Sequence, residues 1–375
     1  MNIKKLNQDY YLLGSIIFLI IFGLVMLFSA SWVKSLEVTN GESRSYFFSS
    51  QLLKFLPALM IFIFFSFLNY RKLQKIAILS LITTFILLLY TKLQGCDLDS
   101  CRWLSIGPIS FQTSDLARFS IILFLADYID KNQKKMINFD KGILIPLLWI
   151  LPSCILVLLQ PDNSTTLIIM SIAIIMLFIG GASFPQILTI SILGISSVGF
   201  MLLNKGNYAL SRITSFFNES SVVNYQSDQA IIGLQQGGFW GLGVGKSVQK
   251  YNYLPETHTD FIFAIIGEEL GFFWGMMLIL TYAFILIRAV QIAKRSNDIF
   301  GIMLSLGFGI SITIYALINI GVVIGLLPVT GVPLPFISYG GSSFLINILM
   351  IAILLNISKS KREFKLKNWR LKVNA

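Results

Sequence analysis

The sequence predicts an all-α polytopic integral membrane protein, and three observations lead to this fold class. Of its 375 residues, 55% are apolar, and the mean hydropathy is +0.76. Only 13% of the residues are charged, whereas soluble domains carry about 25%. The apolar residues also form long runs, and a helix of about 20 apolar residues crosses a hydrocarbon layer roughly 30 Å thick. Together these observations exclude a soluble enzyme.

Ten apolar runs are expected to be the transmembrane helices. In approximate bounds they cover 11–32, 50–69, 76–92, 115–130, 143–160, 165–181, 185–203, 262–290, 300–327 and 341–357. An even number of helices places both chain ends on the same side of the membrane. The first run is longer than the apolar core of a signal peptide, so we expect it to be an uncleaved helix.

The basic residues predict the orientation. With both termini inside, the inner segments carry 19 of the 29 Lys and Arg residues and the outer loops carry 8. Because inner loops are enriched in Lys and Arg, both termini are expected in the cytoplasm. The single domain of residues 1–375 then has one large extracytoplasmic loop, about 204–261, between helices seven and eight, and a basic cytoplasmic tail, 358–375. The net charge of +11 lies mainly in short loops, which argues against a nucleic-acid partner.

The three cysteines and the one histidine lack the spacing of a metal site. Cys96 and Cys101 share an outer loop, and whether they form a disulfide is open. Cys154 lies within an apolar run and is expected to fill space in the core.

Two polar clusters interrupt the apolar runs, where polar groups are costly. Asp115 and Arg118 are three residues apart and are expected on one helix face, either as an internal salt bridge or as a site for an anionic headgroup. The polar run from Gln160 to Thr166 predicts a tight outer turn, in which Asp162, Asn163 or Ser164 caps the next helix.

The densest polar run, Leu254 to Phe261, contains two carboxylates and the only histidine. Asp260 lies where this loop meets an apolar run, so burial is expected to raise its pKa towards that of a general base. The structural alternative is that Thr259 or Asp260 caps the helix that follows. Within that helix, we expect one of Glu268 and Glu269 to face the bundle interior.

Two segments are rich in glycine. Residues 237–247 lack the glycine spacing of a nucleotide-binding loop, and a structural turn is favoured over a backbone that, with Lys250, approaches a pyrophosphate. Residues 328–341 contain three prolines and three glycines, which forbid a regular helix. Non-helical backbone persists at membrane depth only where protein or a water-filled cavity satisfies it, so this segment is expected to line a cavity.

Taken in order, the polar clusters resemble the SEDS (shape, elongation, division and sporulation) family of bacterial cell-wall synthesis, which includes FtsW and RodA. The resemblance covers nearly the whole chain. Its motifs are Arg102-Trp103-Leu104, Phe111 through Arg118, Gln160-Pro161-Asp162, Tyr225-Gln226 with Gln229-Ala230, Val248-Gln249-Lys250, Leu254 through Phe261, and Asn319 with Gly325, Pro328, Gly331 and Ser338 through Ser343. The division-type FtsW subfamily is favoured over the elongation type. The residues that resemble it more closely are Val248-Gln249-Lys250 and Ile266 through Glu269.

The resemblance implies a peptidoglycan glycosyltransferase. Such an enzyme polymerises lipid II, an undecaprenyl-pyrophosphate-linked disaccharide peptide, into β-1,4 glycan strands at the outer face of the bacterial cytoplasmic membrane during division or elongation. It works with a class B penicillin-binding transpeptidase and other divisome or elongasome proteins. Asp260 matches the residue that the family treats as essential, and is expected to be a general base or a ligand of a divalent metal, Mg²⁺ or Mn²⁺. Residues expected to bind substrate are Arg102, Trp103, Gln112, Ser114, Asp115, Arg118, Gln160, Asp162, Gln226, Gln229, Lys250, Glu256, His258, Thr259, Ser338, Ser342 and Ser343.

The chain departs from the family pattern in places. Many members have Pro, Glu and Lys where this chain has Thr113, Asp115 and Arg118. Asp115 keeps the negative charge and Arg118 the positive charge of these members, so we expect the charge pair to be kept. Thr330 stands where many division-type members place a Lys. Two other functions stay open: a lipid II flippase and a non-catalytic scaffold that recruits a transpeptidase. The enzyme is favoured because the polar residues gather near the outer face and do not follow a path across the membrane.

Overall fold

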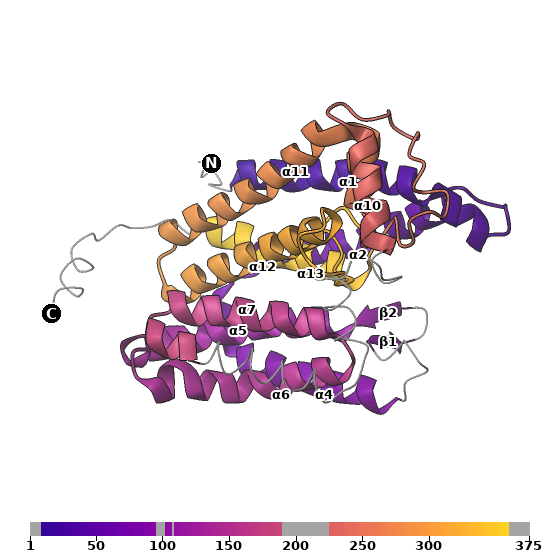
Figure 1. The fold of residues 1–375 in the computed structure, drawn as a ribbon. Helices are drawn as coiled ribbons and strands as arrows, with labels where there is room; N and C mark the ends of the chain where they lie inside the picture. Colours follow the sequence, from indigo (N-terminus) through magenta and orange to yellow (C-terminus); the bar gives the residue numbers. More distant parts are fainter. Residues whose placement is uncertain (1–8, 95–101, 107–108, 190–224, 360–375) are drawn as a thin grey trace.

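The computed structural model describes residues 9–94, 102–106, 109–189 and 225–359, and it is a bundle of long helices (Figure 1). The named elements are α1 (Tyr10–Val38), α2 (Tyr46–Phe67), α3 (Arg71–Lys75), α4 (Ala77–Leu93), β1 (Trp103–Ile106), β2 (Ile109–Gln112), α5 (Thr113–Asn132), the 3-10 turn η1 (Gln133–Lys135), the π turn η2 (Asp140–Leu144), α6 (Ile145–Leu159), α7 (Asn163–Ile179), α10 (Tyr225–Gly237), α11 (Ile262–Arg295), α12 (Ile299–Val323) and α13 (Ser342–Ser358).

The predicted apolar runs coincide with helices, because a run of apolar residues in lipid must satisfy its own backbone hydrogen bonds. The exception is the run 185–203, of which residues 184–189 are helical and the rest lies outside the described residues. Among the described helices, α1, α2, α11 and α12 and the joined segment η2 and α6 are long and apolar enough to cross a membrane. Helices α4, α7 and α13 are apolar but shorter, with 17 residues each.

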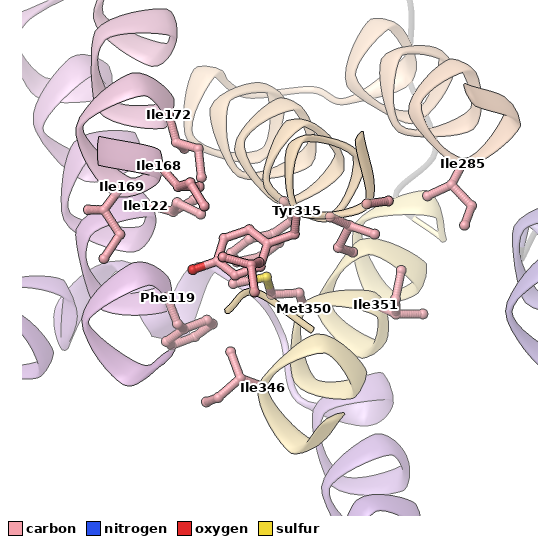
Figure 2. Packing of buried hydrophobic residues seen from close by; sticks show 14 of the residues in the cluster. Phe119, Ile122, Ile168, Ile169, Ile172, Ile285, Tyr315, Ile346, Met350 and Ile351 are labelled. Carbon is pink, nitrogen blue, oxygen red and sulfur yellow. The ribbon is translucent and has the colours of Figure 1, made fainter. Parts of the chain in front are cut away.

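The helices lie in layers (Figure 1). Helix α12 is central and packs against α11, α13, α5 and α7, and α4 and α6 lie on the far side of α5. Figure 2 shows Phe119 and Ile122 of α5, Tyr315 of α12, and Ile346 and Met350 of α13 meeting in one apolar core. Van der Waals packing of these large side chains stabilises the contact between the central helices, because lipid offers no hydrophobic driving force for their association.

Polar contacts join the helix ends at one end of the bundle. The Asp9 main-chain N–H donates to Ser358 Oγ at 3.2 Å, and Arg288 pairs with the Asp9 carboxylate at 2.6 Å. Arg71 pairs with Asp298 at 2.9 Å. The start of α1 and the end of α13 therefore lie side by side.

The opposite end carries α10, the loop after it and a hairpin of β1 and β2 (Figure 1). The hairpin is antiparallel, with Trp103 opposite Gln112 and Leu104 opposite Phe111. The sequence analysis did not predict it. Its strands have only four residues each, too few for period-two alternation to stand out from a loop.

Candidate active site

Asp260 lies in the loop before α11, two residues before the helix begins at Ile262. Asn319 of α12 fixes this loop: its Nδ2 donates to the main-chain oxygens of Asp260 and Val332, both at 2.7 Å. One buried amide thus ties α12 to two non-helical segments that are 72 residues apart in the sequence. The Asp260 side chain is half-buried, and no side chain among the described residues donates a hydrogen bond to its carboxylate.

The segment 324–341 packs against the Asp260 loop. It is non-helical throughout, as its prolines and glycines predict. Ser338 Oγ donates to the Thr259 main-chain oxygen, and the Tyr339 N–H donates to the His258 main-chain oxygen at 2.9 Å. Gly331 has a φ of +70°, and a Cβ there would lie 3.5 Å from Asp260 Oδ2, so the carboxylate rests against bare backbone. That this segment also lines a cavity stays a prediction.

The structural alternative, in which Thr259 or Asp260 caps α11, is wrong. The capping position is Phe261, and no side chain caps the helix. Thr259 instead donates to Glu256 Oε2 at 2.7 Å. The Asp260 carboxylate is therefore not used to stabilise the helix end, which leaves it available for chemistry.

The electrostatic environment raises the pKa of Asp260 to about 7. The largest cause is burial, which penalises the charged form, followed by the negative charge of Glu256; Arg102 opposes the shift and Asp162 adds to it. A carboxylate with this pKa accepts a proton readily near neutral pH. Because Arg102, Asp162 and Glu256 act on Asp260, the structure brings together three motifs that are distant in the sequence.

The Gln160-Pro161-Asp162 turn forms the neighbouring part of the site. Of the three capping candidates in the sequence, Asp162 caps α7 by accepting from the Thr165 N–H at 3.3 Å. Its second oxygen accepts from Gln112 Nε2 at 3.3 Å and from Ser114 Oγ at 3.5 Å. Arg102 donates to the Pro161 main-chain oxygen at 2.6 Å. The hairpin and the turn are thus joined.

Gln160 ties the same turn to α4. Its Nε2 donates to the Leu88 main-chain oxygen at 3.0 Å. The side chain is fully buried.

Asp115 and Arg118 form the predicted salt bridge, with 3.5 Å between Oδ1 and Nη2. Both are buried. Ser342 Oγ donates to Asp115 Oδ2 at 2.9 Å, and Arg118 Nη2 donates to Asn347 Oδ1 at 3.0 Å, so the pair ties α5 to the first turns of α13. Ser343 lies beside them and accepts from Asn347 Nδ2 at 3.4 Å. A role in anion binding, the other interpretation of the pair, stays a prediction.

Both glutamates of α11 face the interior, and both hold the loop after α10. Glu268 accepts from the Val248 N–H at 2.7 Å and from Ser247 Oγ. Glu269 accepts from Lys250 Nζ at 2.8 Å and from Ser29 Oγ of α1. The Lys250 ammonium is fully buried in this ion pair.

The glycines at 237–245 make a structural turn, as favoured from the sequence. Leu242 and Gly243 donate N–H groups to the main-chain oxygens of Glu268 and Glu269. A Cβ on Gly241 would lie 2.2 Å from the Glu269 oxygen, and Gly241 has a φ of +81°. Only glycine permits this approach. Helix α11 is also interrupted near this close approach, at Gly271, whose φ is +80°.

The remaining predicted residues lie around this end of the bundle. Gln226 and Gln229 lie half-buried on the first turns of α10, Trp103 is exposed on β1, and His258 is buried. Within the described ranges, no three His, Cys, Asp or Glu side chains are grouped closely enough to hold a metal ion. The described residues therefore provide no group of protein ligands for a divalent ion at Asp260. Binding of such an ion stays a prediction.

Three functional partners escaped the sequence analysis: Ser29, Ser247 and Asn347. Each pairs with a charged residue that was identified, through bonds that span 240, 21 and 229 residues. Polar residues within apolar runs are a usable signal for Ser29 and Asn347. Ser247 lies in a loop, where serine is ordinary, and carries no such signal.

Comparison with known proteins identifies the family. The model of the FtsW/RodA/SpoVE family, described as cell cycle protein, matches residues 10–363. The chain belongs to this family. Its relatives include the stage V sporulation protein E of Bacillus subtilis, 35% identical over 371 residues that cover 96% of this chain and 100% of the relative. The probable peptidoglycan glycosyltransferase FtsW of the same organism is 35% identical over 95% of this chain and 92% of the relative.

Solved FtsW/RodA/SpoVE-family structures share the fold. A chain from a peptidoglycan synthase complex that coordinates polymerization and crosslinking superposes with a TM-score of 0.76 at 21% identity, covering 95% of this chain and 99% of that chain. RodA of Thermus thermophilus gives a TM-score of 0.70 at 22% identity, covering 95% and 98%. The family model and the curated relatives confirm the SEDS family predicted from the sequence, and the solved structures confirm the fold.

Replacement of Asn319 by leucine is expected to lower stability by about 2 kcal/mol, because two buried carbonyl oxygens lose their donor. Displacement of the Asp260 backbone should also reduce any activity that depends on Asp260. Thermal unfolding in detergent measures the first effect. Ser311→Ala, on the same helix and with no hydrogen-bond partner for its hydroxyl among the described residues, is the matched control. An Asn319→Leu protein as stable and active as Ser311→Ala would contradict the proposed positioning role.

Proposed function

We propose that this family member is a peptidoglycan glycosyltransferase that polymerises lipid II into β-1,4 glycan strands. The observation that carries the proposal is Asp260: a carboxylate without a hydrogen-bond donor among the described residues, with its pKa raised to about 7, held where four segments meet. The names of the curated relatives support the same activity. The division-type role is favoured from the motifs around Lys250 and Glu268.

The proposed topology has ten spans, with both termini in the cytoplasm. The contact of Asp9 with Ser358 supports termini on one side. The site lies at the opposite end of the bundle, which the distribution of Lys and Arg assigns to the outer face of the cytoplasmic membrane. Lipid-linked substrate would then reach Asp260 from the outer leaflet.

In the proposed reaction, Asp260 accepts the proton of the acceptor GlcNAc 4-hydroxyl. The hydroxyl oxygen forms a bond to the anomeric carbon of the donor MurNAc, and the bond from that carbon to undecaprenyl pyrophosphate breaks. Burial supports this role, because a carboxylate with few hydrogen bonds is a stronger base than one in water. No step is assigned to a metal ion.

The other predicted residues receive different roles in this proposal. Arg102 and Glu256 act electrostatically on Asp260, and His258 belongs to the same loop. These residues and Trp103 are proposed to contact the sugars or headgroup. Asp162 and Asp115 are already hydrogen-bonded and position the neighbouring segments. A class B penicillin-binding transpeptidase is the proposed partner, which the similarity to a chain of a peptidoglycan synthase complex supports.

The proposal is tested by supplying purified lipid II to the protein together with a class B transpeptidase blocked by a β-lactam. Gel separation of glycan strands is the readout. Polymer formation supports the glycosyltransferase. Transfer of lipid II across a vesicle bilayer without polymer would support the flippase, and neither activity in a folded complex would support the scaffold; either result contradicts the proposal.

A further inference from the structure

Helix α2 carries a cation inside an apolar segment. Lys54 lies eight residues after the helix begins at Tyr46, about 12 Å along the axis at 1.5 Å per residue. None of the ion pairs among the described residues includes it, and no hydrogen-bond acceptor there receives its protons. A charge at such depth is costly unless it faces a partner or a cavity, so an unpaired one indicates a function.

Lys54 faces the segment that supports Asp260. Its Nζ lies 3.7 Å from the centre of the Tyr339 ring. Ser50 Oγ lies 3.0 Å from the Tyr339 hydroxyl, and the Phe47 ring centre lies 5.1 Å from that of Tyr339. Phe47, Ser50 and Lys54 are spaced by three and four residues and so share one face of α2. Tyr339 in turn bonds to the main chain of His258, two residues before Asp260.

The ammonium also lies beside the N-terminus of α13. It is 3.9 Å from the position that a Cβ would occupy on Gly341, which precedes the first residue of this 17-residue helix. The first turn of α13 contains no acidic residue, and no side chain caps it. A helix N-terminus presents unpaired N–H groups and partial positive charge. The Asp115 carboxylate, which accepts from Ser342 Oγ at the start of α13, is already paired with Arg118. The Lys54 ammonium and the helix N-terminus thus lie close together, and Lys54 forms no ion pair among the described residues.

A second, independent observation points to a ligand at this place. The His258 side chain is only 7% exposed, yet its Nδ1 has no hydrogen-bond partner among the described residues. Its ring lies 4.3 Å from Phe47 and 5.8 Å from Tyr339, centre to centre. Buried polar atoms are normally hydrogen-bonded. The Lys54 ammonium and the His258 ring thus both contact the Tyr339 ring. Among the described residues, Lys54 has no ion-pair or hydrogen-bond partner and His258 Nδ1 has no hydrogen-bond partner.

The other candidate cations are already engaged. Lys250 is paired with Glu269, and Arg118 contacts Asp115 and Asn347. Arg102 donates to the main-chain oxygens of Gln160 and Pro161. These contacts leave Lys54 better placed than any of them to receive an anion.

We propose that Lys54, together with the first turn of α13, binds the pyrophosphate of a polyprenyl-linked substrate. The inference rests on the proposed function and names the residue that holds the anionic group of that substrate. The Tyr339 ring positions the ammonium, and the lipid chain would leave along the apolar face of α2. Undecaprenyl pyrophosphate, the leaving group, keeps this anion and should bind here as well.

The test measures binding of undecaprenyl pyrophosphate to the full chain in phosphatidylcholine nanodiscs. Lys54→Met, which keeps the apolar stem, should weaken binding at least tenfold. Lys54→Arg, which keeps the charge, should stay within about threefold of wild type. Lys72→Met removes one exposed positive charge from α3 and is the matched control. Thermal unfolding of each variant reports folding separately.

Two further ligands distinguish the source of the anion. Phosphatidylglycerol should bind wild type and Lys54→Met equally, and inorganic pyrophosphate should compete with undecaprenyl pyrophosphate in wild type only. Equal binding of undecaprenyl pyrophosphate by wild type and a folded Lys54→Met protein would overturn the inference. So would a dependence on Lys54 that is confined to phosphatidylglycerol.

The outcome is separable from that of the proposed function. Lys54-dependent binding by a protein that makes no glycan would refute the glycosyltransferase and leave the pyrophosphate site standing. A wild-type protein that polymerises lipid II, with an unchanged KM in Lys54→Met, would refute the site alone.

Discussion

Replacing Asp260 by asparagine is expected to lower the rate of glycan polymerisation by about 100-fold or more, since a positioned general base contributes about 10²–10⁴-fold. Asparagine has nearly the same shape and cannot accept the proton. The rate of strand formation from lipid II, measured with a β-lactam-blocked transpeptidase, tests this expectation.

The same variant should fold normally. The pKa of Asp260 in the folded protein, about 7, is above its ordinary value of 3.8, so the ionised carboxylate opposes folding. This penalty grows as the pH rises from about 4 and is complete above about 7. Asp260→Asn should therefore be at least as stable as wild type at pH 8. A well-folded variant that polymerises at the wild-type rate would exclude Asp260 as the base.

Replacing Lys250 by methionine is expected to destabilise the protein by about 3–5 kcal/mol, because it leaves the Glu269 carboxylate buried without its cation. Both side chains are fully buried in the folded state. The loop after α10 depends on the same carboxylate, through the Ser247 N–H. Thermal or denaturant unfolding in detergent measures the loss.

A double variant provides the control. Lys250→Met with Glu269→Gln removes the unpaired charge and should recover part of the lost stability, which a double-mutant cycle quantifies. Lys34→Met breaks an exposed ion pair with Glu37 and should change stability little. If Lys250→Met unfolds at the same temperature as Lys34→Met, the buried pair does not hold the loop.

Much of the fold was predictable, because each membrane helix corresponds to a run of apolar residues in the sequence. The runs at 262–290 and 300–327 became α11 and α12 within a few residues at their starts, since lipid imposes one requirement on every spanning residue. The hairpin of β1 and β2 could not be predicted, because strands of four residues each are too short for an alternating pattern to be recognised.

The sequence was sufficient to identify residues of the candidate site, but not the contacts between them. Asp260 stood out as a carboxylate at the edge of an apolar run. That both Glu268 and Glu269 face inward could not be deduced, because successive helix positions point about 100° apart. Both carboxylates are accommodated because residues 247–250, which lie outside the helical pattern of α11, supply hydrogen-bond donors to Glu268 and Glu269.

The measurement that tests the central claim most directly is the pH dependence of kcat/KM for polymerisation in wild type, Glu256→Gln and Arg102→Met. If Asp260 is the base, the wild-type rate should rise with pH to a plateau, with a midpoint near 7. Glu256 raises the pKa of Asp260 and Arg102 lowers it, so Glu256→Gln should move the midpoint to lower pH and Arg102→Met to higher pH. A midpoint that neither variant moves would contradict the assignment of Asp260 as the general base.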